Sequence, residues 1–132
     1  MASGLAGKWI LESSEKFDEY MTVLGVNIIT RTMAKAAVPT QEIKVNGDEW
    51  YIKTSTTFKT TEITFKIGEE FEETTADGRK VKTTCTIDGN TLIQDQKGTF
   101  DSVLKRELKD GKMVMVLTVQ DVVCTRVYKP TE

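Results

Sequence analysis

Residues 109–128 read KDGKMVMVLTVQDVVCTRVY, and this pattern decides the fold. The Asp-Gly pair near its start and the VQD segment in its middle are turn residues, and each precedes a run of β-branched and apolar residues. Side chains alternate between two faces in an extended chain, so Arg126 shares a face with Cys124 and Tyr128. Alternation alone allows either face to be the core. If Arg126 points inward, it needs an anionic partner, because an unpaired buried charge costs several kcal/mol.

Similar turn signals recur about every ten residues from residue 46 onward and separate runs rich in Thr, Val, Ile, Phe and Tyr. These signals are VNGD (45–48), KIGEE (66–70), TADGRK (75–80), IDGN (87–90), QKGTFD (96–101), KDGK (109–112) and VQD (119–121). Many short strands joined by hairpins are typical of an antiparallel sandwich or barrel. The chain contains no linker, low-complexity tract or clean repeat. Residues 1–132 are therefore predicted to form a single all-β domain.

One segment near the N-terminus has helical periodicity instead. Its apolar residues recur at i, i+3, i+4 and i+7, and they are Phe17, Tyr20, Met21 and Leu24. We predict that Ser14 caps the start of this helix and that Gly25 ends it. A second helix is predicted from Asn27 to about residue 37, with Pro39 after its end and with the apolar residues Ile28, Ile29, Met33, Ala36 and Ala37. A helix pair too small to cover a sheet is better placed as a lid on an open barrel end.

The run before residues 109–112 indicates what the interior of the barrel holds. A barrel of about ten strands is wider than its own side chains fill, so we predict an internal cavity. In DSVLKREL (101–108), Arg106 shares a face with Ser102, Leu104 and Leu108, whereas the opposite face is mostly charged and is the solvent face. Arg106 is thus predicted to point inward. Two inward arginines beside the Tyr128 hydroxyl would form a receptor for one carboxylate through charge-assisted hydrogen bonds.

Composition excludes several classes of function. Eighteen basic and twenty acidic residues give a net charge of −2, which argues against a general nucleic-acid-binding protein. The chain has no histidine, so it cannot form a Ser-His-Asp or Cys-His relay or the usual zinc sites. Cys85 and Cys124 are expected to be free thiols, with Cys124 as a small buried residue. No apolar run of transmembrane length or signal-peptide pattern is present, and we expect a soluble cytosolic protein without catalytic residues, cofactor or metal.

Three motifs resemble the intracellular lipid-binding proteins, in the branch that holds the fatty-acid-binding and cellular retinoic-acid-binding proteins. They are GKWILESSEKFDEYM (7–21), KTSTTFKTTEITFKIGEEFEETTADGRK (53–80) and DVVCTRVY (121–128), and the resemblance extends over essentially the whole chain. It implies a lipocalin/calycin-like, ten-stranded antiparallel β-barrel, or β-clam, whose two helices form a portal lid. It also implies that Arg106, Arg126 and Tyr128 take the ligand carboxylate in a partly hydrated interior.

The same resemblance assigns side chains to the cavity wall and the portal. Phe58 is the implied portal aromatic, although by itself it is an exposed turn residue. Asp77 is an implied wall residue, whereas the acidic run EEFEETTAD (69–77) that contains it is predicted to be solvated edge and turn. The other implied cavity and portal residues are Phe17, Tyr20, Met21, Leu24, Met33, Ala34, Pro39, Ala76, Met115 and Leu117.

The sequence leaves the ligand open between a long-chain fatty acid and retinoic acid. The connection within QDQKGTFDSVLKREL (94–108) is shorter than is typical of retinoic-acid binders, which favours a fatty acid. The segments LGVN, YIKTSTT, KTTEI and DVVCTRVY are retinoid-like instead. Lys16 stands where the family usually has Asn, which weakens the cap of the first helix.

We predict a monomeric carrier that binds a long-chain fatty acid in the cytoplasm and moves it between membranes and enzymes, with transient membrane contact through the helical lid. The alternative is a regulatory module that delivers retinoic acid to a nuclear receptor or a metabolic enzyme, in the nucleus as well as the cytoplasm. Arg31, Lys35 and Lys59 would form its basic cluster. Thr22, however, occupies a position that is often lysine in relatives that enter the nucleus, so transport is the preferred interpretation.

Overall fold

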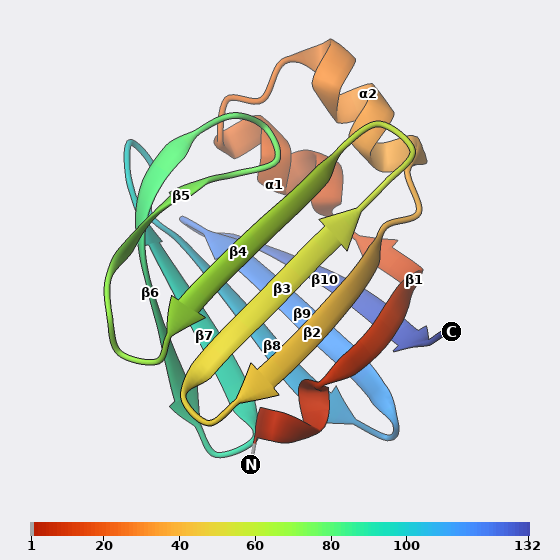
Figure 1. Cartoon of the computed structure of the whole chain (residues 1–132). Helices are drawn as coiled ribbons and strands as arrows, with labels where there is room; N and C mark the ends of the chain where they lie inside the picture. Colours follow the sequence, from red (N-terminus) through yellow and green to blue (C-terminus); the bar gives the residue numbers. More distant parts are fainter. Residues whose placement is uncertain (1) are drawn as a thin grey trace.

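The strands of the computed structural model form one sheet that curves into a barrel, with α1 and α2 at one end of it (Figure 1). The structure describes residues 2–132. The elements in that range are η1 (Ala2–Leu5), β1 (Gly7–Glu15), α1 (Phe17–Val23), α2 (Ile28–Ala36), β2 (Thr40–Asn46), β3 (Glu49–Ser55), β4 (Thr60–Lys66), β5 (Phe71–Thr74), β6 (Lys80–Asp88), β7 (Thr91–Lys97), β8 (Ser102–Lys109), β9 (Lys112–Val119) and β10 (Val122–Pro130). The predicted ten-stranded antiparallel barrel with a two-helix cap is confirmed.

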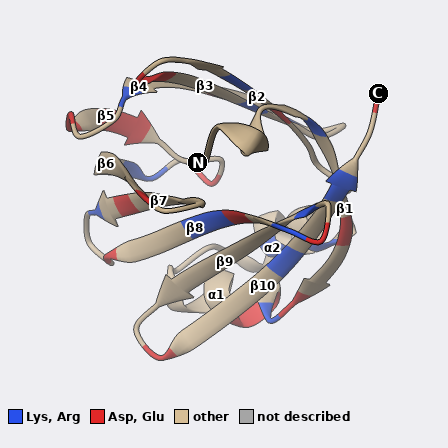
Figure 2. Cartoon of the chain, turned by 90° about the horizontal axis from the view of Figure 1, so that it is seen from below, with Lys and Arg blue, Asp and Glu red and all other residues tan. Residues whose placement is uncertain are grey.

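The strand order is β4-β3-β2-β1-β10-β9-β8-β7-β6-β5, and every hydrogen-bonded pair in it is antiparallel. Figure 2 shows two curved layers that meet near β1, with β4 and β5 on the opposite side. The pairing of β1 with β10 shifts register between Leu11 and Ser13, where β1 leaves β2. An irregularity of this kind bends a strand, which lets β1 take part in both layers. β4 and β5 lie at the two ends of this order and do not pair with each other. The barrel is therefore nearly closed, with a gap between these two strands.

Each turn segment predicted from the sequence contains all or part of the connection between two successive strands, and its outer residues overlap the strand ends. The connection between β8 and β9 shows the physical reason. Asp110 has a φ of 53° and Gly111 a φ of 76°. Two consecutive positive φ values define a type I′ hairpin turn, whose twist matches the twist of the flanking strands and which favours Asp-Gly. The turn sequence thus fixes the register of β8 against β9.

The first helix begins later than its predicted cap. Ser14 lies in β1 rather than at the helix start, so the prediction that it caps α1 is wrong. The N-cap is Lys16, which has a φ of 63° and makes no side-chain cap hydrogen bond. The predicted end is confirmed, because Gly25 has a φ of 82° and its N–H bonds to the Thr22 carbonyl oxygen at 3.1 Å. Glycine takes this left-handed conformation without steric cost.

The second helix forms within the predicted range, but it packs little. Asn27 accepts a hydrogen bond from the backbone N–H of Thr30 at 2.9 Å. None of the residues of α2 is buried, and Ile29 in its apolar set is 72% exposed. Arg31 connects α2 to α1 and to the segment between the two helices. Its Nε donates to Asp18 Oδ1 at 3.1 Å, and its Nη1 donates to the Val26 carbonyl oxygen at 2.7 Å. A few polar bonds, rather than a buried apolar face, thus hold α2 in place.

The apolar core fills the barrel end away from these helices. Figure 1 shows η1 at the end opposite α1 and α2. Leu5 of η1 is fully buried, and Trp9 donates its indole N–H to the Leu5 carbonyl oxygen at 2.8 Å. The rings of Trp50, Phe65 and Phe71 stack in series, with centroid distances of 6.3 and 5.4 Å. This end is packed, which leaves the space beneath the helices for a ligand.

Candidate ligand-binding site

The barrel encloses a cavity of about 540 Å³, bordered by both helices and by strands from both layers. This volume lies in the range of small-molecule pockets, roughly 300–1,000 Å³. Every residue predicted for the carboxylate site, the cavity wall or the portal borders this cavity. The wall also contains residues that sequence analysis did not select, among them Gln41, Ile52, Glu73, Arg79, Gln94, Gln96 and Leu104.

Arg106 and Arg126 point to the same inner face from two strands that flank β9. Both residues pair in register with Met115, Arg106 from β8 and Arg126 from β10. Residues paired across neighbouring strands project to the same face of a sheet. Arg106 is 4% exposed and Arg126 is 5% exposed. Tyr128 lies two positions beyond Arg126 on the same face and is also buried.

Arg106 is bonded to two neutral amides. Its Nε donates to Gln41 Oε1 at 3.1 Å, and its Nη1 donates to Gln94 Oε1 at 2.8 Å. Among residues 2–132, no ion pair joins Arg106 to a carboxylate. Burial lowers the pKa of its guanidinium group from the ordinary value, but arginine still remains protonated in proteins. The cavity therefore contains a buried positive charge whose hydrogen-bond partners are neutral, and the Glu73 carboxylate acts on it only through space, as a weaker influence that opposes the effect of burial on the pKa of Arg106.

Arg126 connects three elements through its guanidinium group. Its Nη1 donates to Ser14 Oγ in β1 at 3.1 Å, and its central carbon lies 3.9 Å from the centroid of the Phe17 ring in α1. An arginine over an aromatic face is attracted by the ring quadrupole. No ion pair of Arg126 with a carboxylate is present in the described part of the chain. Its charge is thus also available to a ligand anion.

Glu73 forms a second buried polar cluster, on the β5 side of the cavity. Its carboxylate accepts hydrogen bonds from Thr83 at 2.8 Å, from Gln94 at 2.9 and 3.1 Å, and from Gln96 at 3.0 Å. The prediction that residues 69–77 are solvated is wrong for Glu73, which is 9% exposed. Strand alternation carried the signal, because Glu73 shares a face of β5 with the part-buried Phe71.

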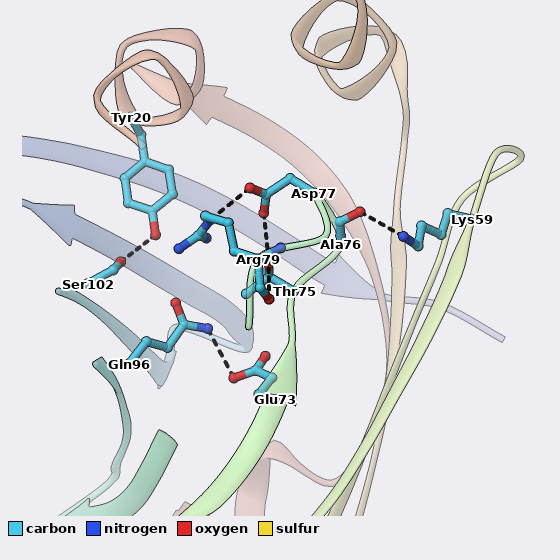
Figure 3. Close-up of polar contacts among 9 residues, drawn as sticks. All are labelled: Tyr20, Lys59, Glu73, Thr75, Ala76, Asp77, Arg79, Gln96 and Ser102. Atoms are coloured by element: carbon cyan, nitrogen blue, oxygen red, sulfur yellow. Dashed lines mark hydrogen bonds and ion pairs between the residues drawn. The ribbon is translucent and has the colours of Figure 1, made fainter. Parts of the chain in front are cut away.

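The rim of the cavity is held by polar contacts between turns (Figure 3). Arg79 Nε pairs with Asp77 Oδ2 at 2.7 Å, and Thr75 donates to Asp77 Oδ1, also at 2.7 Å. Burial raises the pKa of the Asp77 carboxyl, but the hydrogen bonds from Arg79 and Thr75 outweigh burial and hold that pKa below its ordinary value. Lys59 reaches across to the Ala76 carbonyl oxygen at 3.0 Å. Phe58, in the same turn as Lys59, is 57% exposed.

Tyr20 attaches the first helix to the barrel. Its hydroxyl is hydrogen-bonded to the hydroxyl of Ser102 in β8 (Figure 3). Burial raises the pKa of Tyr20, although the bond to Ser102 and the charge of Arg79 act in the opposite direction. The phenol is therefore neutral, and it belongs to the cavity wall as a hydrogen-bonding group.

The two cysteines are buried free thiols, as predicted. Burial raises the pKa of Cys85 to about 12 and that of Cys124 to about 11, so both are protonated at neutral pH. Within residues 2–132, no group of three or more His, Cys, Asp or Glu side chains is arranged to hold a metal ion. In the same range no helix has the length and apolar character needed to span a membrane.

A nearly closed ten-stranded barrel, a two-helix cap and an internal cavity with buried arginines together define a lipid-binding class of protein. The model of the Lipocalin / cytosolic fatty-acid binding protein family matches residues 6–130, and the chain belongs to this family. Its relatives are lipid-binding transporters rather than enzymes.

Particular relatives agree with this assignment. The chain is 70% identical over 129 residues to the sodium/calcium exchanger regulatory protein 1 of Doryteuthis pealeii, which covers 98% of both chains. The solved structure of the REP1-NXSQ fatty acid transporter is 69% identical, with a TM-score of 0.98 over 99% of this chain and 98% of that chain. A Schistosoma mansoni fatty acid binding protein in complex with arachidonic acid is 38% identical, with a TM-score of 0.96 over 99% of this chain and 98% of that chain.

Proposed function

We propose that this protein is a monomeric carrier that binds a long-chain fatty acid in the cytoplasm, with the carboxylate at Arg106, Arg126 and Tyr128. The observation that supports this proposal most is the pair of buried guanidinium groups on one inner face, because neither has a carboxylate partner among residues 2–132. A ligand carboxylate supplies the missing negative charge. The names of the solved relatives point to the same class of ligand.

The hydrogen bonds within the protein leave donors for such a ligand. They use Nε and Nη1 of Arg106 and Nη1 of Arg126. A carboxylate has about four acceptor positions and takes charge-assisted bonds from several donors at once. An alcohol of the same length brings no charge and leaves both arginines uncompensated, so the site favours acids.

The rest of the cavity suits an apolar chain. Its wall contains the side chains of Met21, Leu24, Leu104, Met115 and Leu117. Methionine is flexible and polarisable and adapts to ligands of different shape. We therefore expect the chain to accept more than one acyl length, with burial of methylene groups providing most of the affinity.

Competition between ligands tests this function. We expect oleate to displace a bound fluorescent fatty acid at a concentration at least tenfold below that needed with oleyl alcohol. All-trans retinoic acid and retinol are the other two competitors, because the retinoid alternative predicts that retinoic acid binds more tightly than oleate. Equal displacement by oleate and oleyl alcohol would contradict the carboxylate site. Tighter binding of retinoic acid than of oleate would identify retinoic acid as the ligand in place of a fatty acid.

Membrane contact through the lid is supported by exposed apolar side chains in α2, in the segment after it and in the turn between β3 and β4. They are Ile28, Ile29, Met33, Val38 and Phe58. Transfer of a fluorescent fatty acid to vesicles tests this part, since a collision mechanism makes the transfer rate rise with vesicle concentration. A rate independent of vesicle concentration would indicate release into water instead.

A second candidate function is regulation of a sodium/calcium exchanger, favoured by the 70% identity with a relative of that name. Exchange currents measured with the fatty-acid-loaded protein, the empty protein and the Arg106→Gln variant test it. We expect stimulation by the loaded protein alone. Delivery to a nuclear receptor is less favoured, because Arg31 and Lys35 of its basic cluster both pair with Asp18, at 3.1 and 3.6 Å.

A further inference from the structure

One buried polar atom in the cavity is not explained by binding of a carboxylate at Arg106 and Arg126. Gln96 is 3% exposed and borders the cavity, and its side-chain oxygen Oε1 has no hydrogen-bond partner among residues 2–132. The amide cannot be reversed to satisfy it, because its Nε2 donates to Glu73 Oε1 at 3.0 Å. Reversal would place two acceptors against each other. The free acceptor is therefore fixed in direction, and leaving it unpaired in a buried site costs free energy.

The groups around this oxygen form a small polar site beneath α1. Gln96 in β7 pairs in register with Ser102 in β8, so their side chains leave the sheet on the same face. Ser102 is bonded to the Tyr20 hydroxyl. Figure 3 shows the Gln96 oxygen on the side of Tyr20 and Ser102, with the guanidinium group of Arg79 between Asp77 and this pair. Arg79 bonds Asp77 through Nε, which leaves its two terminal nitrogens as donors.

The acceptor Gln96 Oε1 and the cationic donor Arg79 both border the cavity, and a hydroxyl group of a ligand could bond to both. A hydroxyl donates one hydrogen bond and accepts others, whereas a methylene does neither and a carboxylate cannot donate. A second carboxylate would also lie near Glu73, whose negative charge opposes it. We propose that Gln96 and Arg79, beside the Tyr20–Ser102 pair, form a subsite for a hydroxyl on the acyl chain, and that the protein binds hydroxylated long-chain fatty acids.

The subsite is separate from the carboxylate site but connected to it through the protein. Gln94 bonds both Arg106 and Glu73, and Glu73 in turn bonds Gln96. Two side chains thus separate Gln96 from the arginine that holds the headgroup. A ligand with its carboxylate at Arg106 therefore places the hydroxyl partway along the chain and not beside the headgroup. This inference rests on the proposed binding of fatty acids.

Titration calorimetry with stearate, 2-hydroxystearate, 10-hydroxystearate and 12-hydroxystearate tests the proposal. The readout is the ratio of the Kd of stearate to the Kd of each hydroxystearate. We expect the ratio to be largest for one mid-chain isomer and to fall about tenfold for that isomer in Gln96→Met, because its hydroxyl then loses its acceptor. The 2-hydroxy acid should show no such fall, since its hydroxyl lies beside the carboxylate.

Thr83→Val is the matched control. Thr83 is fully buried and donates to the same Glu73 oxygen as Gln96 does, but it does not border the cavity. The control should leave the isomer ratios unchanged, although it also removes a donor from Glu73. If Gln96→Met does not fold, Arg79→Met in the turn after β5 replaces it and should lower the same ratio by removing the donor.

Each outcome decides the question. Equal ratios for all isomers, unchanged in Gln96→Met, would mean that an internal water satisfies the oxygen and that the subsite does not exist. A fall of the same size in Thr83→Val would assign the effect to the Glu73 cluster and also overturn the proposal. Failure of wild-type protein to bind stearate is a separate result, because it would overturn the proposed function itself and this inference with it.

Discussion

The cavity contains two buried ionic regions that differ in how their charge is compensated. Glu73 accepts hydrogen bonds from three side chains, so the protein itself completes its environment. Arg106 is bonded to two amide oxygens, and Arg126 to a hydroxyl and an aromatic ring. Within residues 2–132, none of these three charged groups contacts an opposite charge, so they differ in how many hydrogen-bonding positions remain open, and the arginines keep terminal N–H donors for a ligand. The comparison predicts a structural role for the carboxylate of Glu73 and a ligand-binding role for the two arginines.

The largest expected effect is the loss of binding in Arg106→Gln. Removing one partner of a buried charge pair costs about 3 kcal/mol, or roughly 100-fold in the Kd of oleate. The unfolding free energy of the empty protein should stay the same or rise, because burial of the charged guanidinium group is unfavourable and the neutral amide avoids this cost. Titration calorimetry and thermal melts measure the two quantities.

Lys105→Gln is the control for this variant. Lys105 is exposed on the outer face of the same strand, and its loss changes the net charge equally. It should change the Kd of oleate less than about twofold. A large drop in the melting temperature of empty Arg106→Gln would show that the protein pairs this arginine, and the comparison would then fail.

Glu73→Gln should show the reverse pattern. Hydrogen bonds to a charged group contribute about 1.5–3 kcal/mol, and even with its oxygen at the Oε1 position the new amide places a donor against Gln94 Nε2. We expect the unfolding free energy to fall by about 2 kcal/mol and oleate binding to change little. The control is Glu72→Gln, at the exposed neighbouring position in β5. Weakened oleate binding with unchanged stability would place Glu73 in the binding site and remove the distinction.

The lid should be less stable than the strands that carry the arginines. None of the residues of α2 is buried, whereas β9 and β10 alternate buried residues along their length. Amide exchange in the empty protein should be faster in residues 26–35 than in 112–128, and saturating oleate should slow it in the helix by about tenfold. Uniform exchange, or a helix unaffected by ligand, would contradict gating by the lid.

The smallest expected effect concerns Asp77 at the rim. Its pKa in the folded protein lies below the ordinary value of 3.8, so its ionised form is favoured by folding. This contribution is present above pH 3.8 and disappears as the pH falls through the lowered pKa. Asp77→Asn should therefore lower the unfolding free energy at pH 7 by less than about 1 kcal/mol, with no loss near pH 2. Asp110→Asn, in an exposed turn, is the control, and a loss that persisted at low pH would exclude the ion pair as its cause.

Local patterns predicted most of the fold from the sequence. Turn residues mark the strand ends, because positive φ favours Gly and Asp, and the charged opposite face of its strand indicated that Arg106 points inward. Alternation left the direction of Arg126 open, and the family resemblance implied that it points inward. The start of α1 was predicted wrongly, because Ser14 is opposite Arg126 in the pairing of β1 with β10 and accepts a bond from its side chain, a contact between residues 112 apart in sequence. A capping rule that considers neighbouring residues alone contains no such contact.

The buried carboxylate was missed for a similar reason. The donors to Glu73 come from β6 and β7, between 10 and 23 residues away in sequence. Residues 69–77 contain many acidic side chains, so the whole run was predicted to be solvated and the inward direction of Glu73 was not recognised. Gln96 and Arg79 lie in the turn signals 96–101 and 75–80, which predict turns and no ligand contact, and their shared position at the cavity appears only once β7, β8 and the turn after β5 are placed together. Polar residues that form a cavity wall depend on tertiary arrangement, whereas strand faces depend on local alternation.

The central claim is that the arginines recognise the charge of the ligand headgroup, and a cycle of two ligands and two proteins tests it most directly. Oleate and oleyl alcohol are each titrated into the wild-type protein and into Arg106→Gln. The wild type should bind oleate at least tenfold more tightly than the alcohol, and this preference should largely disappear in the variant, because the loss of about 3 kcal/mol falls on oleate alone. An equal loss of affinity for both ligands, or no preference in the wild type, would contradict the claim.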